Sequence, residues 1–225
     1  MARFSKWDVT DAIRETGLVP VFYHPQKETA ENAVKACYRA GVRIFEFTNR
    51  GDFAHEVFEH LERFMEQECP GMILGAGSVT DPATAALFVQ MGAAFIVGPN
   101  FNPEVARLCN RRLIPYIPGC ATATEVGNAQ EAGCEICKIF PASEIGGPSF
   151  IKSLKAPMPR SLFLVTGGVE PREENLREWF KAGATCVGMG SALFTKELLI
   201  ANDWSGITRL CKISLEAIAG IRSTI

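Results

Sequence analysis

Short apolar runs alternate with amphipathic segments along almost the whole chain. Eight runs are rich in Val, Ile, Leu and Phe and are four to six residues long, which is typical of parallel-sheet strands buried on both faces. The runs span residues 18–23, 44–48, 72–76, 94–97, 113–117, 136–140, 162–165 and 186–189. The longer segments between them carry apolar residues at helical spacing, so the pattern predicts strands and helices in alternation.

The expected helix ends carry recognisable signals. Glycines that can end a helix in the left-handed conformation precede four of the strands, at positions 41, 92, 133 and 183. Helix starts are marked by an N-cap residue before proline at 81–82 and 102–103, a capping box at 122–125, and acids after Pro171. Further helices are expected over 28–40, 53–68 and 204–219, and an additional one over 4–16 precedes the first strand.

This alternation predicts an α/β fold, a single (β/α)8 TIM barrel over residues 1–225 with an extra N-terminal helix. Trp7 and Ile13 of that helix are expected to cover the bottom of the barrel. The alternative is a doubly wound open sheet, which usually carries a glycine-rich nucleotide loop after its first strand. Residues 23–27 read Tyr-His-Pro-Gln-Lys and do not form such a loop.

Composition narrows the choice of partners. A formal net charge of −2 gives no support for nucleic acid or an anionic membrane as partner, and no apolar run approaches the roughly 20 residues of a membrane helix. Residues 1–8 are too polar for a secretory signal. The 8 cysteines are scattered through apolar segments, which indicates reduced core thiols in a cytoplasmic protein. Cys134 and Cys137 have CxxC spacing but lack a second pair, so we interpret them as packing residues.

Lys138 stands out because it lies within an expected buried strand. Burial disfavours the charged ammonium and makes the free amine available, and a free amine is what Schiff-base chemistry on a keto acid requires. The alternative is a lysine whose chain extends past the strand end into solvent.

The second strand places polar residues on one face. Alternation sends Glu46, Thr48 and Arg50 to one side of the sheet and Phe45 and Phe47 to the other. If the phenylalanines face the helices, the barrel mouth receives the Glu46 carboxylate, which can move protons. It also receives two candidate substrate-binding groups, the Thr48 hydroxyl and the Arg50 guanidinium, and the guanidinium can bind a carboxylate. The alternative is a structural ion pair between Glu46 and Arg50.

Glycine-rich segments follow three other strands. Ser78 follows the third, residues 166–168 (Thr-Gly-Gly) end the seventh, and residues 188–192 end the eighth and lead into a short helix. Loops after strands seven and eight commonly bind phosphate in this fold through backbone N–H groups. Ordinary tight turns without a ligand remain the alternative. The three histidines form no cluster with acids at ligand spacing, so a metal-dependent mechanism is not expected.

Six motifs occur together in a recognisable order and spacing. They are Glu-Phe-Thr-Asn-Arg at 46–50, Gly-Ala-Gly-Ser-Val at 75–79, Ile-Pro-Gly at 117–119, Lys-Ile-Phe-Pro-Ala at 138–142, Thr-Gly-Gly-Val at 166–169 and Gly-Ser at 190–191. In this arrangement the chain resembles the class I 2-keto-3-deoxy-6-phosphogluconate and 4-hydroxy-2-oxoglutarate aldolases over nearly its whole length.

The resemblance implies a lyase without metal or cofactor that acts on a phosphorylated keto acid and is often a homotrimer. It implies that Lys138 forms the Schiff base with pyruvate and Glu46 transfers protons. The residues implied to bind substrate are Arg50 and Ser78 at the pyruvate carboxylate, Pro99 and Phe140 at the pocket wall, and Thr166, Gly167, Gly168, Gly190 and Ser191 at the aldehyde and phosphate side. Departures from the family pattern at Asn49, Gly98–Asn100 and Ser143 leave the identity of the substrate open.

The sequence leaves two other functions open. A phosphosugar epimerase or isomerase could use a similar barrel without needing Lys138. A phosphosugar-sensing barrel without turnover would keep the phosphate loops and lose the acid and the amine, so the presence of both Glu46 and Lys138 argues against it. The sequence does not distinguish gluconate from galactonate skeletons, which differ at one stereocentre.

Overall fold

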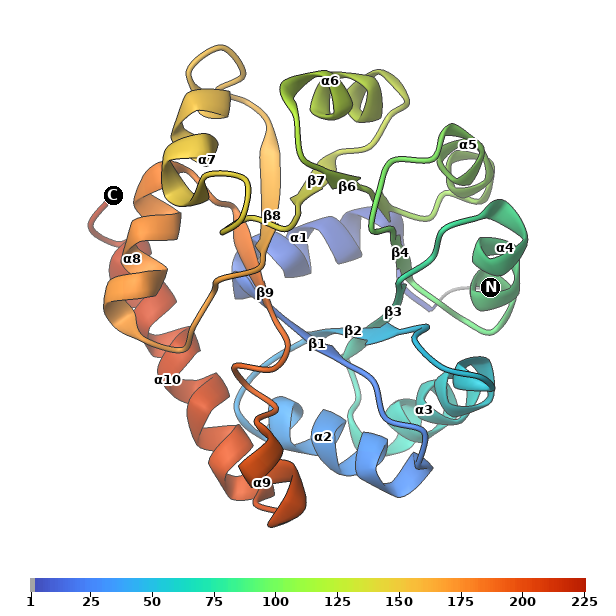
Figure 1. The fold of residues 1–225 in the computed structure, drawn as a ribbon. Helices are drawn as coiled ribbons and strands as arrows, with labels where there is room; N and C mark the ends of the chain where they lie inside the picture. The colour runs from blue at the N-terminus through green and yellow to red at the C-terminus, as the bar shows by residue number, and fades with distance from the viewer. Residues whose placement is uncertain (1–2) are drawn as a thin grey trace.

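A computed structural model describes residues 3–225, which form a parallel barrel surrounded by helices (Figure 1). The strands are β1 (Leu18–Phe22), β2 (Ile44–Thr48), β3 (Ile73–Gly77), β4 (Phe95–Val97), β5 (Tyr116–Ile117), β6 (Gly119–Cys120), β7 (Ile136–Ile139), β8 (Leu162–Thr166) and β9 (Cys186–Met189). The helices are α1 (Lys6–Thr16), α2 (Lys27–Arg39), α3 (Ala54–Glu68), α4 (Pro82–Gln90), α5 (Pro103–Arg112), α6 (Ala123–Glu131), α7 (Gly147–Lys155), α8 (Glu173–Ala182), α9 (Lys196–Ile200) and α10 (Trp204–Arg222). The predicted TIM-barrel class and the extra N-terminal helix are confirmed.

The fifth predicted strand differs from the prediction. Leu113, its expected first residue, is the C-cap of α5 in a left-handed conformation, and the strand begins only at Tyr116. It then divides at Pro118, so that β5 pairs with β4 and β6 pairs with β7. Proline has no N–H to donate to a ladder. Its carbonyl still accepts from Lys138 N at 2.8 Å, and Gly119 N donates to Gly98 O at 3.0 Å, so hydrogen bonds continue around the barrel.

Local signals set the helix boundaries as expected. Asp81, Asn102 and Thr122 are N-caps whose side chains accept from backbone N–H groups in the first helical turn. The capping box predicted at 122–125 is only half formed, because Glu125 Oε2 accepts from Ala121 N and not from Thr122 N. Glycines 41, 92, 133 and 183 all have positive φ directly after helices, as predicted for helix C-termini.

The core has two layers. Phe45 and Phe47 belong to the larger layer, between the strands and the outer helices. The smaller layer fills the barrel near the amino ends of the strands, where Val9 and Ile13 of α1 pack on Ile44. Figure 1 shows α1 crossing behind the strands while the other helices lie around them. Ile13 therefore covers the bottom of the barrel as expected, but Trp7 does not, because it lies on the outer face of α1 and is 68% exposed.

Candidate active site

Lys138 points into the barrel. It lies on β7 opposite Gly119 of β6, and its side chain is only 9% exposed. The Nζ atom lies 3.5 Å from Glu46 Oε1 and 5.5 Å from the centre of the Phe140 ring. The lysine side chain is therefore buried, as the first interpretation of the sequence predicted, and does not extend past the strand end into solvent.

Glu46 reaches Lys138 from the opposite side of the barrel interior. The glutamate side chain is 1% exposed, and its neighbours Phe45 and Phe47 face the helices. Gly77 of β3 makes room for it, since a Cβ atom there would lie 2.1 Å from Glu46 Oε1. Within residues 3–225 the ion pair of Glu46 is formed with Lys138 and not with Arg50, and its Oε2 atom has no hydrogen-bond partner. A buried carboxylate with a free oxygen can accept a proton from a group placed beside it.

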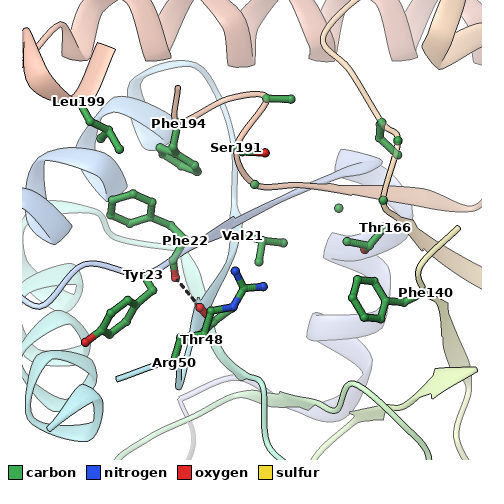
Figure 2. Close-up of a pocket in the computed structure, with 16 residues that line it drawn as sticks. Val21, Phe22, Tyr23, Thr48, Arg50, Phe140, Thr166, Ser191, Phe194 and Leu199 are labelled. Atoms are coloured by element: carbon green, nitrogen blue, oxygen red, sulfur yellow. Dashed lines mark hydrogen bonds between the residues drawn. The ribbon is translucent and has the colours of Figure 1, made fainter. Parts of the chain in front are cut away.

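A pocket opens beyond this pair, toward the carboxyl ends of the strands (Figure 2). Thr48 and Phe140 line it. Thr48 follows Glu46 by two positions on the same face of β2, and Phe140 follows Lys138 by two positions, just past the end of β7. The cavity has a volume of about 400 Å³. Its lining residues are Val21, Phe22, Tyr23, Thr48, Arg50, Phe140, Thr166, Gly167, Gly168, Val169, Gly188, Gly190, Ser191, Ala192, Phe194 and Leu199.

The structure brings most of the predicted binding residues to this pocket. Eight of them line it, namely Thr48, Arg50, Phe140, Thr166, Gly167, Gly168, Gly190 and Ser191. Ser78 and Pro99 are not among the lining residues. Ser78 follows β3 with a φ of 59°, and Pro99 is exposed after β4 with its carbonyl against Gly119. The roles assigned to all ten remain predictions.

The aromatic part of the lining was not predicted from the sequence. Phe22 and Tyr23 could have been found, because the rule that strand ends carry the site also applies to β1. Phe194 and Leu199 carried no signal, because they follow a turn after β9 and resemble ordinary core residues.

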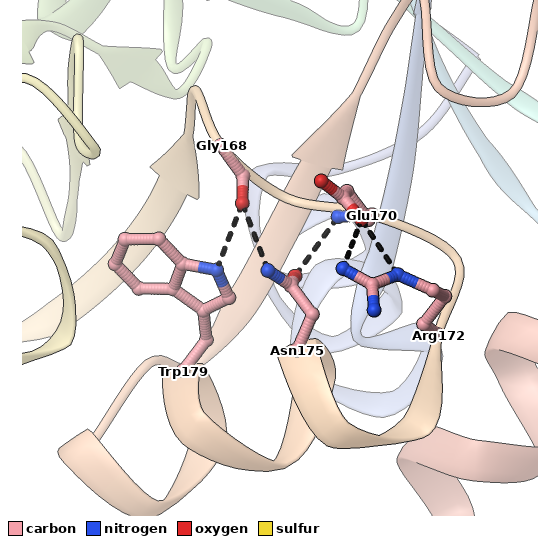
Figure 3. Close-up of polar contacts among 5 residues, drawn as sticks. All are labelled: Gly168, Glu170, Arg172, Asn175 and Trp179. Atoms are coloured by element: carbon pink, nitrogen blue, oxygen red, sulfur yellow. Dashed lines mark hydrogen bonds and ion pairs between the residues drawn. The ribbon is translucent and has the colours of Figure 1, made fainter.

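The loop after β8 is held from outside by α8 (Figure 3). Gly168 O accepts from Asn175 Nδ2 at 3.1 Å and from Trp179 Nε1 at 3.4 Å, and Glu170 N donates to Asn175 Oδ1 at 2.9 Å. In a trans peptide the C=O and the next N–H point in opposite directions. The N–H of Val169, a residue that lines the pocket, therefore points away from the Asn175 and Trp179 side chains of α8.

The turn after β9 uses part of its own backbone. Leu193 N and Phe194 N both donate to Gly190 O at 3.0 Å, and the Thr195 side chain accepts from Leu198 N at the start of α9. These amides are therefore engaged within the protein. Thr166 Oγ1, across from this turn, is buried and has no partner in the described part of the chain, and Gly188 leaves space for it.

Charge and metal-ligating groups are sparse at the site. Arg50 is the one charged side chain among the described residues that line the pocket. Between residues 3 and 225 no three His, Cys, Asp or Glu side chains are grouped so that they could hold a metal ion. Cys134 and Cys137 are buried, and burial raises the pKa of the Cys134 thiol to about 12, which fits a packing role.

Known proteins share both the sequence and the fold. The family model "KDPG and KHG aldolase" matches residues 9–210. A 2-dehydro-3-deoxy-phosphogluconate aldolase of Treponema pallidum is 31% identical over 210 residues, 93% of this chain and 97% of its own. A 2-dehydro-3-deoxy-6-phosphogalactonate aldolase of Escherichia coli is 43% identical over 123 residues, 54% of this chain and 58% of its own.

A solved structure adds a chemical observation on a relative. The KDPG aldolase of Legionella pneumophila, with pyruvate captured as a covalent carbinolamine intermediate, superposes with a TM-score of 0.81 at 28% identity, covering 89% of this chain and 95% of that one. The resemblance inferred from the six motifs is confirmed, and the chain belongs to the KDPG and KHG aldolase family.

Proposed function

We propose that this protein is a class I aldolase that cleaves 2-keto-3-deoxy-6-phosphogluconate, or a close 2-keto-3-deoxy acid, to pyruvate and an aldehyde such as glyceraldehyde 3-phosphate. The observation that carries the proposal is the buried Lys138 amine, 3.5 Å from the buried Glu46 carboxylate. Neither residue is itself among the lining residues of the pocket, but Phe140 and Thr48, two positions after them, are. Membership of an aldolase family supports the reaction class.

The reaction follows from the two buried groups. Lys138 attacks the C2 ketone, and loss of water gives a protonated imine. Glu46, directly or through a water molecule, takes the proton of the C4 hydroxyl, and the electrons of the C3–C4 bond flow into the imine. An enamine and an aldehyde result. Protonation of the enamine at C3 and hydrolysis then release pyruvate and restore the lysine.

The remaining residues would hold the two ends of the substrate. Arg50 suits the pyruvate carboxylate because it offers a cationic fork within the pocket. The loops after β8 and β9 suit a phosphate. Side chains of α8 bond Gly168 O from outside the loop, and this supports a hydrogen bond from the Val169 amide to the phosphate. We expect a phosphorylated six-carbon substrate to exceed its unphosphorylated analogue in kcat/KM by about tenfold, ~1.4 kcal/mol. Equal values would favour 4-hydroxy-2-oxoglutarate, and the phosphogalactonate skeleton is the remaining alternative.

The site favours catalysis over sensing or isomerisation. A sensing barrel would not need a buried acid and amine in contact, and an isomerase would not need Lys138.

No helix within residues 3–225 could span a membrane. We further propose a cytoplasmic homotrimer that acts at the aldol step of the Entner–Doudoroff route, and light scattering at three times the chain mass would support the trimer.

Trapping the imine tests the proposal. Borohydride added with pyruvate should attach a stable three-carbon adduct to Lys138, identified by peptide mass spectrometry. Lys138→Arg keeps the positive charge but cannot form the imine, so it should lose both the adduct and nearly all pyruvate release. An adduct on another lysine, or a fully active Lys138→Arg enzyme, would exclude this mechanism.

A further inference from the structure

A second hollow lies at the amino end of the barrel, opposite the active-site pocket. It opens between the start of α1, the end of α4 and the end of α5, and its volume of about 700 Å³ exceeds that of the active-site pocket. Figure 1 shows α1 behind the strands, on the face that this helix closes. We call the hollow the basal groove, and the side chains that define it are Phe4, Lys6, Trp7, Arg111, Arg112 and Leu113. The mechanism above gives the basal groove no role.

The basal groove gathers apolar side chains that are open to solvent. Trp7 is 68% exposed and Leu113 is 72% exposed, and Phe4 lies half-buried in the same lining. Single exposed apolar residues are ordinary on a protein surface, whereas a group of them in one hollow is typical of an interaction site. A molecule that covered Trp7 and Leu113 would remove this apolar surface from water.

The backbone at Leu113 adds a second observation. Leu113 is the C-cap of α5 and has a left-handed conformation, with φ 56° and ψ 38°. Gly and Asn adopt this conformation at lower cost than Leu, whose Cβ crowds the backbone there. The side chain does not repay that cost by filling the core, because most of it is exposed. Contact with another molecule would give the Leu113 side chain a role that the isolated chain does not.

The charges around the basal groove are all positive. Its described lining contains Lys6, Arg111 and Arg112 and no carboxylate, although the formal net charge of the chain is −2. Lys6 is paired with Glu135 at 2.5 Å, whereas Arg111 and Arg112 are exposed and form no ion pair within residues 3–225. Arginines suit the last turn of α5 because the helix dipole is negative there, but the dipole does not explain the apolar side chains beside them. The groove therefore complements an acidic segment that carries an apolar side chain.

We propose that the basal groove docks an acidic segment of a partner protein. One large apolar side chain of the segment lies between Trp7 and Leu113, and its carboxylates pair with Arg111 and Arg112. Trp and Arg are the residues that most often dominate the binding energy of protein interfaces, and complementary charges accelerate the encounter. Because the groove and the active-site pocket lie at opposite ends of the barrel, the docked protein stays open to its substrate. This inference does not rest on the proposed reaction.

A phage-displayed library of random peptides, selected on the intact protein, provides the probe. We expect the selected peptides to carry Asp or Glu on both sides of a Trp, Phe or Leu. Fluorescence anisotropy then measures the affinity of a synthetic copy of the dominant peptide, which should weaken as the ionic strength rises because salt screens exposed charges. The inference is wrong if no peptide is enriched, or if the enriched peptides are basic or uncharged.

Variants of the groove test where the peptide binds. Leu113→Asn removes the apolar contact and places a better-suited residue at the left-handed position, so the free energy of unfolding in urea should be unchanged or higher. Its affinity for the peptide should fall by at least about tenfold, as for the loss of an interface hot spot, and the double variant Arg111→Glu, Arg112→Glu should show a similar loss. Ile213→Asn and Arg209→Glu on α10 make the same kinds of change at exposed positions outside the groove, and should leave the affinity unchanged.

Full peptide affinity in the Leu113→Asn variant would overturn the inference, as would an equal loss in the Ile213→Asn control. Light scattering distinguishes a partner protein from a second copy of this chain. We expect the same mass for the wild type and for Leu113→Asn at equal concentration. A smaller mass for the variant would show that the groove is an interface between copies of this chain, and would exclude the docking of a partner segment there.

Discussion

The two oxygens of Glu46 have different environments. One lies 3.5 Å from Lys138 Nζ, and the other is buried without a partner in the described chain. Glu46→Gln keeps the shape but removes the proton acceptor, so kcat should fall by roughly 10²–10⁴-fold, the usual contribution of general acid–base catalysis. Steady-state pyruvate release measures the loss, and imine trapping should persist. An unfolded variant, or one with normal activity, would mean that the carboxylate serves only as a structural partner of the lysine.

Asn175 lies outside the pocket and is expected to act through the loop after β8. Its side chain donates to Gly168 O and accepts from Glu170 N. Asn175→Asp keeps the acceptor but loses the donor, so the Val169 amide should lose its fixed direction. The loss of one hydrogen bond is about 1 kcal/mol, or roughly fivefold in kcat/KM for the phosphorylated substrate.

The control for Asn175 comes from the same loop. Arg172 forms an exposed ion pair with Glu170, and Arg172→Ala should change the kinetics little, because exposed pairs contribute little free energy. The positioning role also predicts a rise in KM for the phosphorylated substrate with unchanged pyruvate trapping. Equal losses on phosphorylated and unphosphorylated substrates would show that Asn175 supports only the general fold.

Among the elements, β2 and β3 have to be matched closely for Glu46 to reach its partner. Gly77 pairs with Thr48, and a methyl group at Gly77 would lie 2.1 Å from Glu46 Oε1. Gly77→Ala should therefore displace the carboxylate, abolish most activity and destabilise the fold by about 1–3 kcal/mol, the usual cost of overpacking. Gly127→Ala in α6 has no atom within 4 Å of the new methyl group, so it should stabilise the protein by about 0.5–1 kcal/mol. Urea unfolding measures the stability of both variants, and pyruvate release measures their activity. A fully active Gly77→Ala enzyme would contradict the placement of Glu46 against Gly77.

Local sequence signals predicted most elements but not their interruptions. Caps such as Asp81 and Asn102 act within one helical turn, so their sequence is sufficient to locate a helix start. The alternation in β2 likewise placed Glu46 inside the barrel. The division of the fifth strand at Pro118 depends on two different neighbouring strands. The aromatic part of the pocket lining likewise brings Phe22 of β1 beside Phe194, which follows β9. Such features arise from tertiary contacts that a local pattern does not contain.

At the scale of the whole molecule, the barrel separates stability from chemistry. Its amino end is closed by Ile13 and Val9 of α1, while the pocket lies at the carboxyl ends of the strands. Changes on the outer helices, away from the contacts that Asn175 and Trp179 of α8 make with the loop after β8, should therefore alter the free energy of unfolding without altering catalysis. Glu62 on α3 provides such a case, because it is partly buried against Gly92 and does not line the active-site pocket.

Burial raises the pKa of Glu62 from 4.5 to about 7, with nearby Arg3 opposing the rise and Glu66 adding to it. Between these two values the folded protein holds a proton that the unfolded chain has lost, so stability falls as the pH rises from 4.5 to 7. Above pH 7 the folded state bears the full free-energy cost of ionising the partly buried Glu62 carboxyl, and below pH 4.5 this cost vanishes. Glu62→Gln removes this ionisation, so the variant should gain about 1–2 kcal/mol relative to wild type between pH 4 and pH 8, after allowance for partial exposure. Urea midpoints at both pH values measure the gain. Glu216→Gln serves as the control, because Glu216 is exposed on α10 and is not among the groups that shift the pKa of Glu62. A difference independent of pH would show that Glu62 is ionised alike in both states.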